Sequence, residues 1–127
     1  MIAQYAQAGI VSELKRLATP ASADSIPSSA MQEDHVSMGW SAARKLRKAV
    51  DGLQRVLAVE ILTAARAIDM REETPANGTG AVINALRATV PGPGTDRYLS
   101  PEIEETVRLV KSGALIEAVE AATSELR

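Results

Sequence analysis

The sequence predicts an all-α fold, in which one very long central helix with flanking shorter helices packs into an oligomeric helical bundle. Apolar residues recur at helical spacing along most of the chain, and no proline falls between residues 34 and 71. Phenylalanine is absent and aromatic residues make up 2%, so the core must consist of Ala, Leu, Val and Ile, which suit closely packed helices. We divide the chain into residues 1–71, with a polar loop and the long helix, and residues 72–127, a C-terminal helical segment.

The first helix is predicted over residues 1–18, with Ile10, Leu14 and Leu17 on one face together with Ile2, Tyr5 and Ala6. Proline at position 20 ends it, because proline disfavours the helical conformation of the residue before it. The helix has no capping residue at its start, which suggests a chain cut from a longer protein. Residues 19–32 form a loop whose length is typical of functional loops.

The long helix is predicted from Asp34 to Arg71, roughly 55 Å at about 1.5 Å per residue. Between Val56 and Ala65 it is apolar nearly all round, which predicts burial on every side and contacts with other chains or a missing domain. Glu60 interrupts this run, and burying an unpaired ion is costly. We therefore expect Glu60 to pair with Arg66, Arg71 or a partner chain.

Two further helices are predicted after a linker at residues 72–79. The first covers residues 80–89, with Thr79 as its cap, and ends before Pro91. The second has Ser100 as N-cap and Pro101 in its first turn.

The chain then turns at Gly113, which is a typical C-terminal stop for a helix. A last helix is predicted over residues 114–126. These C-terminal helices carry no recognisable chemistry and are interpreted as support.

Composition excludes several classes of function. The net charge of −2 gives no indication of nucleic-acid binding, and the basic cluster at residues 44–48 is interpreted as a solvated or interfacial helix face. The lack of cysteine and the single histidine exclude disulfides, thiolate metal sites and multi-histidine metal sites. No targeting signal or membrane-spanning run is visible, and we expect a cytoplasmic location.

The polar segment 25–39 concentrates the ionisable groups that suggest chemistry. Gln32, Glu33, Asp34 and His35 follow one another at the predicted start of the long helix. Acidic groups there face the positive end of the helix dipole, which keeps them ionised and suits binding of a cationic ring or proton transfer. The alternative is a simple capped helix start, with Asp34 as the cap and His35 as a hydrogen-bonded structural residue.

The first 70 residues, approximately, resemble the histidine ammonia-lyases of the methylidene-imidazolone (MIO)-dependent aromatic amino acid lyase superfamily. The resemblance is carried by a long motif and by shorter ones on either side of it. They are Gln32-Glu33-Asp34-His35-Val36-Ser37-Met38-Gly39, Met1-Ile2-Ala3-Gln4, Val11-Ser12-Glu13, Pro20-Ala21-Ser22, Asp24-Ser25-Ile26-Pro27 and Ala43-Arg44-Lys45-Leu46.

This resemblance implies non-oxidative removal of ammonia from L-histidine to give trans-urocanate, in a homotetramer whose active sites draw on three subunits. It implies that Glu33 is the active-site glutamate beside the substrate imidazole, and that Ser29 and Gln32 line the substrate pocket. Phenylalanine and tyrosine ammonia-lyases usually carry glutamine at the position of Glu33, and a carboxylate fits an imidazole better than a carboxamide does.

The chain departs from the family pattern at the cofactor. The MIO electrophile is made from an Ala-Ser-Gly triplet, but Ala21-Ser22 is followed by alanine and Ser112-Gly113 is preceded by lysine. Tyr5 and Tyr98 do not sit in the motifs of the family's catalytic tyrosines. We therefore expect an inactive C-terminal fragment of a histidine ammonia-lyase. The alternatives are a stand-alone helical oligomerisation module and a fragment of a related tyrosine or phenylalanine ammonia-lyase or aminomutase.

Overall fold

The computed structural model describes residues 2–123 of the 127-residue chain. Within them it contains five helices and a single isolated β-bridge, so the all-α prediction is confirmed. The chain divides into two compact units, Met1–Leu53 and Gln54–Arg127. No helix of the described part is long and apolar enough to cross a membrane.

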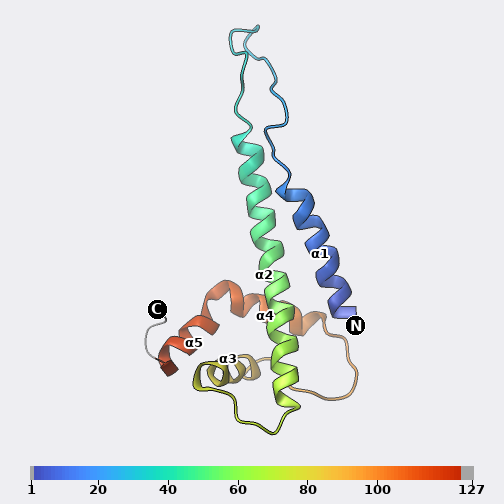
Figure 1. Ribbon diagram of the computed structural model, residues 1–127, viewed down its shortest axis with the longest axis vertical. Coiled ribbons are helices and arrows are strands. Elements are labelled where there is room, and N and C mark those ends of the chain that lie inside the picture. Colours follow the sequence, from blue (N-terminus) through green and yellow to red (C-terminus); the bar gives the residue numbers. More distant parts are fainter. Residues whose placement is uncertain (1, 124–127) are drawn as a thin grey trace. The chain divides into compact units, whose positions relative to one another are not determined.

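The first unit contains α1 (Ile2–Ala18) and the N-terminal part of α2 (Gly39–Asp69), joined by the loop at residues 19–38 (Figure 1). The two helices lie side by side and approach closely at Gly52. A Cβ atom at that position would lie 2.9 Å from Leu14 Cδ2 and 3.3 Å from Ile10 Cγ2. The absence of a side chain at Gly52 therefore allows the contact, and Ile10 and Leu14 are half-buried as predicted. Ile2 and Tyr5, predicted for the same face, are exposed.

The long helix α2 begins later than predicted, at Gly39 instead of Asp34, and has 31 residues. The carbonyl oxygen of Met38 accepts the N–H of Ala42 at 3.0 Å, and Ser37 Oγ accepts the N–H of Gly39 at 3.2 Å. Ser37 thus satisfies a backbone donor at the helix start. The prediction that Asp34 caps this helix was wrong.

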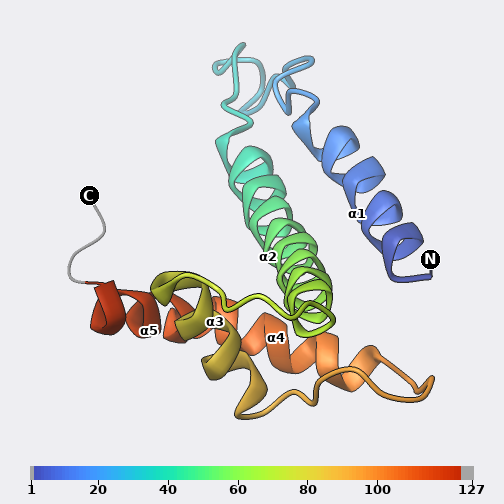
Figure 2. The same cartoon turned by 60° about the horizontal axis from the view of Figure 1, so that its bottom comes forward.

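The second unit combines the C-terminal part of α2 with α3 (Asn77–Arg87), α4 (Ser100–Ser112) and α5 (Ala114–Thr123) (Figure 2). Its core consists of buried aliphatic residues from all four helices and from the turn after α3. They are Leu62, Ala65, Ile83, Leu86, Val90, Leu109 and Leu115.

Glycine 113 ends α4 as predicted, in the left-handed conformation with φ 81°. The predicted caps of the two preceding elements were wrong. α3 begins at Asn77, before Thr79, and has no side-chain cap. α4 begins at Ser100 itself, because the carbonyl of Leu99 accepts the N–H of Ile103 at 3.0 Å. The last helix is described to Thr123, and the end predicted at residue 126 lies outside the described residues.

The apolar run at Val56–Ala65 is buried on one side only within this chain. Ala58, Val59, Leu62 and Ala65 are buried, whereas Glu60 is exposed. Among the described residues, the ion pairs of this unit join other groups, namely Arg55–Glu104, Arg87–Asp69, Arg97–Glu102 and Arg108–Glu105. Within the described residues of this chain Glu60 therefore has no ion pair with Arg66 or Arg71, because the acid lies on the helix side that faces away from the core. Its burial against a partner chain, and pairing there, stay predictions.

The core of the second unit predicts the effect of a cavity. Leu86 is fully buried, so Leu86→Ala should lower the free energy of unfolding of this unit by about 2–5 kcal/mol. Ile116→Ala is the control, because Ile116 is 57% exposed and should change stability by less than about 0.5 kcal/mol. Urea unfolding followed by circular dichroism measures both, and equal losses would contradict the assigned core.

Candidate active-site loop

A narrow turn between Ser28 and Glu33 forms the tip of the loop that precedes α2. The two residues pair as an antiparallel bridge. Ser28 N–H donates to the carbonyl of Glu33 at 2.9 Å, and Glu33 N–H donates to the carbonyl of Ser28 at 3.3 Å. These two bonds close a four-residue turn, residues 29–32, within which Gln32 N–H donates to the carbonyl of Ser29 at 3.2 Å.

The closed turn requires an unusual backbone. Ser29, Ala30 and Met31 have φ values of 53°, 55° and 66°, all in the left-handed region. Side chains with a Cβ disfavour this region by about 1–2 kcal/mol per residue. Such conformations persist only where the surrounding bonds impose them, and they concentrate at functional sites.

A second clamp holds the base of the same loop. Val36 N–H donates to Ser25 Oγ at 2.8 Å, and Ser25 Oγ donates to the carbonyl oxygen of Asp34 at 3.4 Å. Ser25 and Val36 are half-buried, unlike the exposed tip. The side chain of Ser25 therefore joins the segments that lead into and out of the turn.

Glu33 is exposed on this turn, and its carboxylate has a neighbour that sequence reasoning missed. Ser28 Oγ donates to Glu33 Oε2 at 3.1 Å. The sequence does not predict this contact, because two adjacent serines, Ser28 and Ser29, precede Glu33. Only the structure shows which of the two contacts the carboxylate. The predicted pocket residues Ser29 and Gln32 belong to the same turn as Glu33 and are also exposed.

Asp34 and His35 lie beyond the turn, exposed, and well before the first residue of α2. The influence of a helix dipole falls off within the first turn of the helix. The prediction that the dipole of the long helix orients Glu33 and Asp34 is therefore wrong. Hydrogen bonds within the loop orient Glu33 instead.

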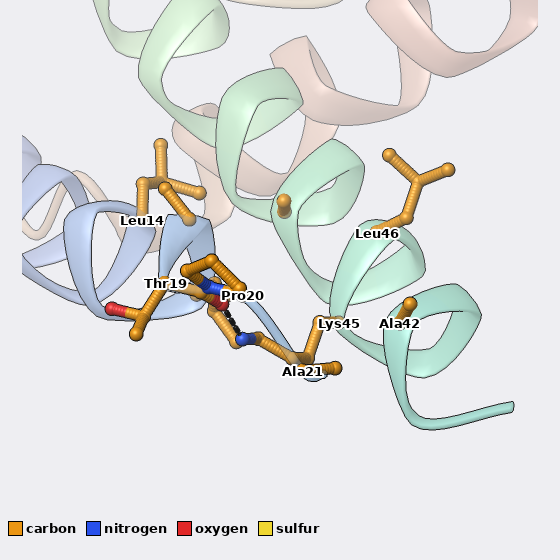
Figure 3. A pocket seen from close by; sticks show the side chains of 10 residues that line it. Leu14, Thr19, Pro20, Ala21, Ala42, Lys45 and Leu46 are labelled. Atoms are coloured by element: carbon orange, nitrogen blue, oxygen red, sulfur yellow. Dashed lines mark hydrogen bonds between the residues drawn. The ribbon is translucent and has the colours of Figure 1, made fainter. Parts of the chain in front are cut away.

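The loop leaves α1 beside a mainly apolar cavity of about 320 Å³, lined by residues of α1, the loop start and α2 (Figure 3). The ammonium group of Lys45 donates to the carbonyl oxygen of Thr19 there. This bond satisfies a carbonyl at the end of α1 and ties the first loop residue to α2. In the part of the chain that the structure describes, no group of three or more His, Asp or Glu side chains could hold a metal ion.

Comparison with known proteins identifies the family. The family model for aromatic amino acid lyases matches residues 1–88, and the chain belongs to this family. It is 63% identical to a histidine ammonia-lyase of Streptomyces coelicolor, covering all of this chain and 25% of that protein. It is 50% identical to a histidine ammonia-lyase of Gloeobacter violaceus, with 99% and 25% covered.

Two solved structures share the fold. One is a histidine ammonia-lyase from Trypanosoma cruzi, with 39% identity and a TM-score of 0.86 over 93% of this chain and 24% of that one. The other is a tyrosine aminomutase from Streptomyces globisporus, with 35% identity and a TM-score of 0.89 over 98% and 24%. The chain spans about a quarter of the length of the curated relatives that it matches.

The left-handed turn predicts a matched pair of effects at Ala30. Ala30→Val should open the turn, because a β-branched residue is strongly disfavoured at φ 55°. Ala30→Gly should keep it, because glycine adopts this conformation without a steric cost. Hydrogen exchange of the Ser28 and Glu33 amides reports the two bridge bonds, and exchange should be about tenfold faster in the valine variant. Equal exchange in both variants would contradict the turn geometry.

Proposed function

We propose that this chain is the C-terminal part of a histidine ammonia-lyase, which releases ammonia from L-histidine non-oxidatively and leaves trans-urocanate. The observation that carries the proposal is the Glu33 carboxylate, exposed on a constrained turn in a chain that is 63% and 50% identical to two proteins named histidine ammonia-lyase. In this proposal residues 1–71 supply the active-site loop and the bundle helix, and residues 72–127 support them.

Glu33 is assigned to the imidazole of the substrate. An ionised carboxylate accepts the N–H of a neutral imidazole and stabilises an imidazolium by its charge. A carboxamide at the same place presents only one acceptor and no charge. Ser29 and Gln32 are assigned to the pocket wall, because they share the turn with Glu33.

The electrophile of the proposed reaction lies outside this chain. The family's MIO group derives from an Ala-Ser-Gly triplet, and the 127 residues do not contain one. When present, that group supplies the electrophilic centre for loss of the amine. This chain supplies no atom of it, so we propose that the chain alone is inactive and that another part of a cytoplasmic parent enzyme provides the electrophile.

The proposal includes assembly as a homo-oligomer, a tetramer in the parent enzyme. In the first unit, Leu46, Val50 and Leu53 recur in steps of four and three along α2 and are 65%, 45% and 49% exposed. An apolar stripe with this spacing is typical of helices that pack in bundles. An oligomerisation module without catalytic role would share this feature but does not account for the constrained Glu33 turn.

A second candidate is a fragment of a tyrosine-specific lyase or aminomutase. It is favoured by the likeness to the tyrosine aminomutase structure at 35% identity. The higher identity to the histidine ammonia-lyases and the carboxylate at position 33 favour histidine.

The role of Glu33 is testable in the full-length parent enzyme. Glu33→Gln should lower kcat/KM for L-histidine by about 10- to 150-fold, the loss expected for a hydrogen bond to a charged group. Asp34→Asn is the matched control, because this exposed neighbour lies outside the turn, and it should retain activity. The ultraviolet absorbance of urocanate measures the rate, and unchanged kinetics in Glu33→Gln would remove Glu33 from the site.

The oligomer is testable on the chain itself. Static light scattering should give a mass above that of one 13.4 kDa chain, and Leu46→Asp with Val50→Asp should lower it. Met70→Asp serves as control, because Met70 is 66% exposed but follows the end of α2. A stable monomer before substitution would contradict the proposed assembly.

A further inference from the structure

The carboxylate of Glu33 has a built-in partner. Its residue is joined to Ser28 by three hydrogen bonds, two between backbone groups and one from the Ser28 hydroxyl to Oε2 at 3.1 Å. The two backbone hydrogen bonds fix the position of the Glu33 main chain, and the hydrogen bond from the hydroxyl fixes the direction of its carboxylate. Both kinds of restraint come from the same serine.

Such a restraint matters because Glu33 is exposed and its side chain has several rotatable bonds. A free glutamate loses rotamer freedom when it engages a ligand, and that loss opposes binding. Ser28 already holds Oε2, which leaves Oε1 available to an incoming donor. A hydroxyl serves well here, since it donates one hydrogen bond and carries no charge that would compete with a cationic ligand.

The contact between Ser28 and Glu33 requires an unfavourable backbone conformation in the residues between them. Three successive residues between Ser28 and Gln32 adopt left-handed φ values, although none of them is glycine. If nothing required this backbone conformation, we would expect the turn to adopt ordinary φ values or to contain glycine. Here the turn brings Ser28 and Glu33, five positions apart in sequence, into direct side-chain contact.

We infer that Ser28 is a positioning residue, whose hydroxyl orients the Glu33 carboxylate so that Oε1 meets the imidazole of the substrate. The inference rests on the proposed function for its substrate, but the contact between Ser28 and Glu33 does not. Ser28 touches no reacting atom and acts only through Glu33.

The test uses three variants of the full-length parent enzyme. Ser28→Ala removes the hydroxyl, Ser28→Thr keeps one, and Ser22→Ala makes the same deletion at an exposed serine of this loop with no side-chain hydrogen bond among the described residues. Ser28→Ala should lower kcat/KM for L-histidine about tenfold. Ser28→Thr and Ser22→Ala should stay within about twofold of the parent, inside the range of surface substitutions.

Coupling to Glu33 separates positioning from a general structural role. When Glu33→Gln is already present, adding Ser28→Ala should cause little further loss, because the two residues act as one unit. Equal losses in both backgrounds would overturn the inference, as would a loss in Ser28→Thr as large as that in Ser28→Ala.

A measurement on the 127-residue chain keeps the inference independent of the lyase assignment. NMR of the Glu33 side chain should show a preferred rotamer in the parent chain and in Ser28→Thr, and averaging in Ser28→Ala. If the full-length enzyme lacked activity on histidine while these differences appeared, the proposed function would fail and the positioning contact would stand. Rotamer averaging already present in the parent chain would overturn the contact.

Discussion

The candidate site depends on the paired backbone hydrogen bonds between Ser28 and Glu33. They close the turn, force Ser29, Ala30 and Met31 into left-handed conformations and bring the Ser28 hydroxyl to the Glu33 carboxylate. A backbone hydrogen bond stabilises a fold most where its donor and acceptor would otherwise be buried without a partner. This turn is exposed, so water can replace the partner of each backbone group, and each bond contributes less. The clamp at Ser25 and Val36, half-buried below the tip, compensates by restricting the ends of the turn.

Different interactions stabilise the rest of the two units. In the first unit, the loop is anchored at one end by Lys45 on the carbonyl of Thr19 and at the other by Ser37 on the first residue of α2. In the second unit, an aliphatic core around Leu86 and Val90 is formed without aromatic residues. Polar anchors therefore dominate near the loop, and hydrophobic burial dominates in the C-terminal helices.

Sequence periodicity was sufficient to predict the helices but not their starts. The spacing of leucine, valine and isoleucine extends over several helical turns, so it identifies a helix and its buried face. The first residue of a helix depends on only one or two hydrogen bonds, which this spacing does not reveal. Asp34 was a plausible cap by residue type, yet it directly follows the Ser28–Glu33 turn, five residues before α2 begins, and Ser37 makes the capping contact. Gly113 was predictable because a left-handed helix end has a strong residue preference. Glu33 was predicted as a site residue from its motif, but its contact with Ser28 was not, because that contact exists only when three non-glycine residues adopt left-handed conformations.

We propose that this loop presents the Glu33 carboxylate to an imidazole. A crystal structure of the full-length enzyme with a bound imidazole-containing substrate analogue would show this contact or its absence. We expect an imidazole nitrogen within about 2.7–3.2 Å of Glu33 Oε1, with Oε2 still accepting a hydrogen bond from the Ser28 hydroxyl. An analogue bound with its imidazole against other residues, and with Glu33 directed to solvent, would contradict it.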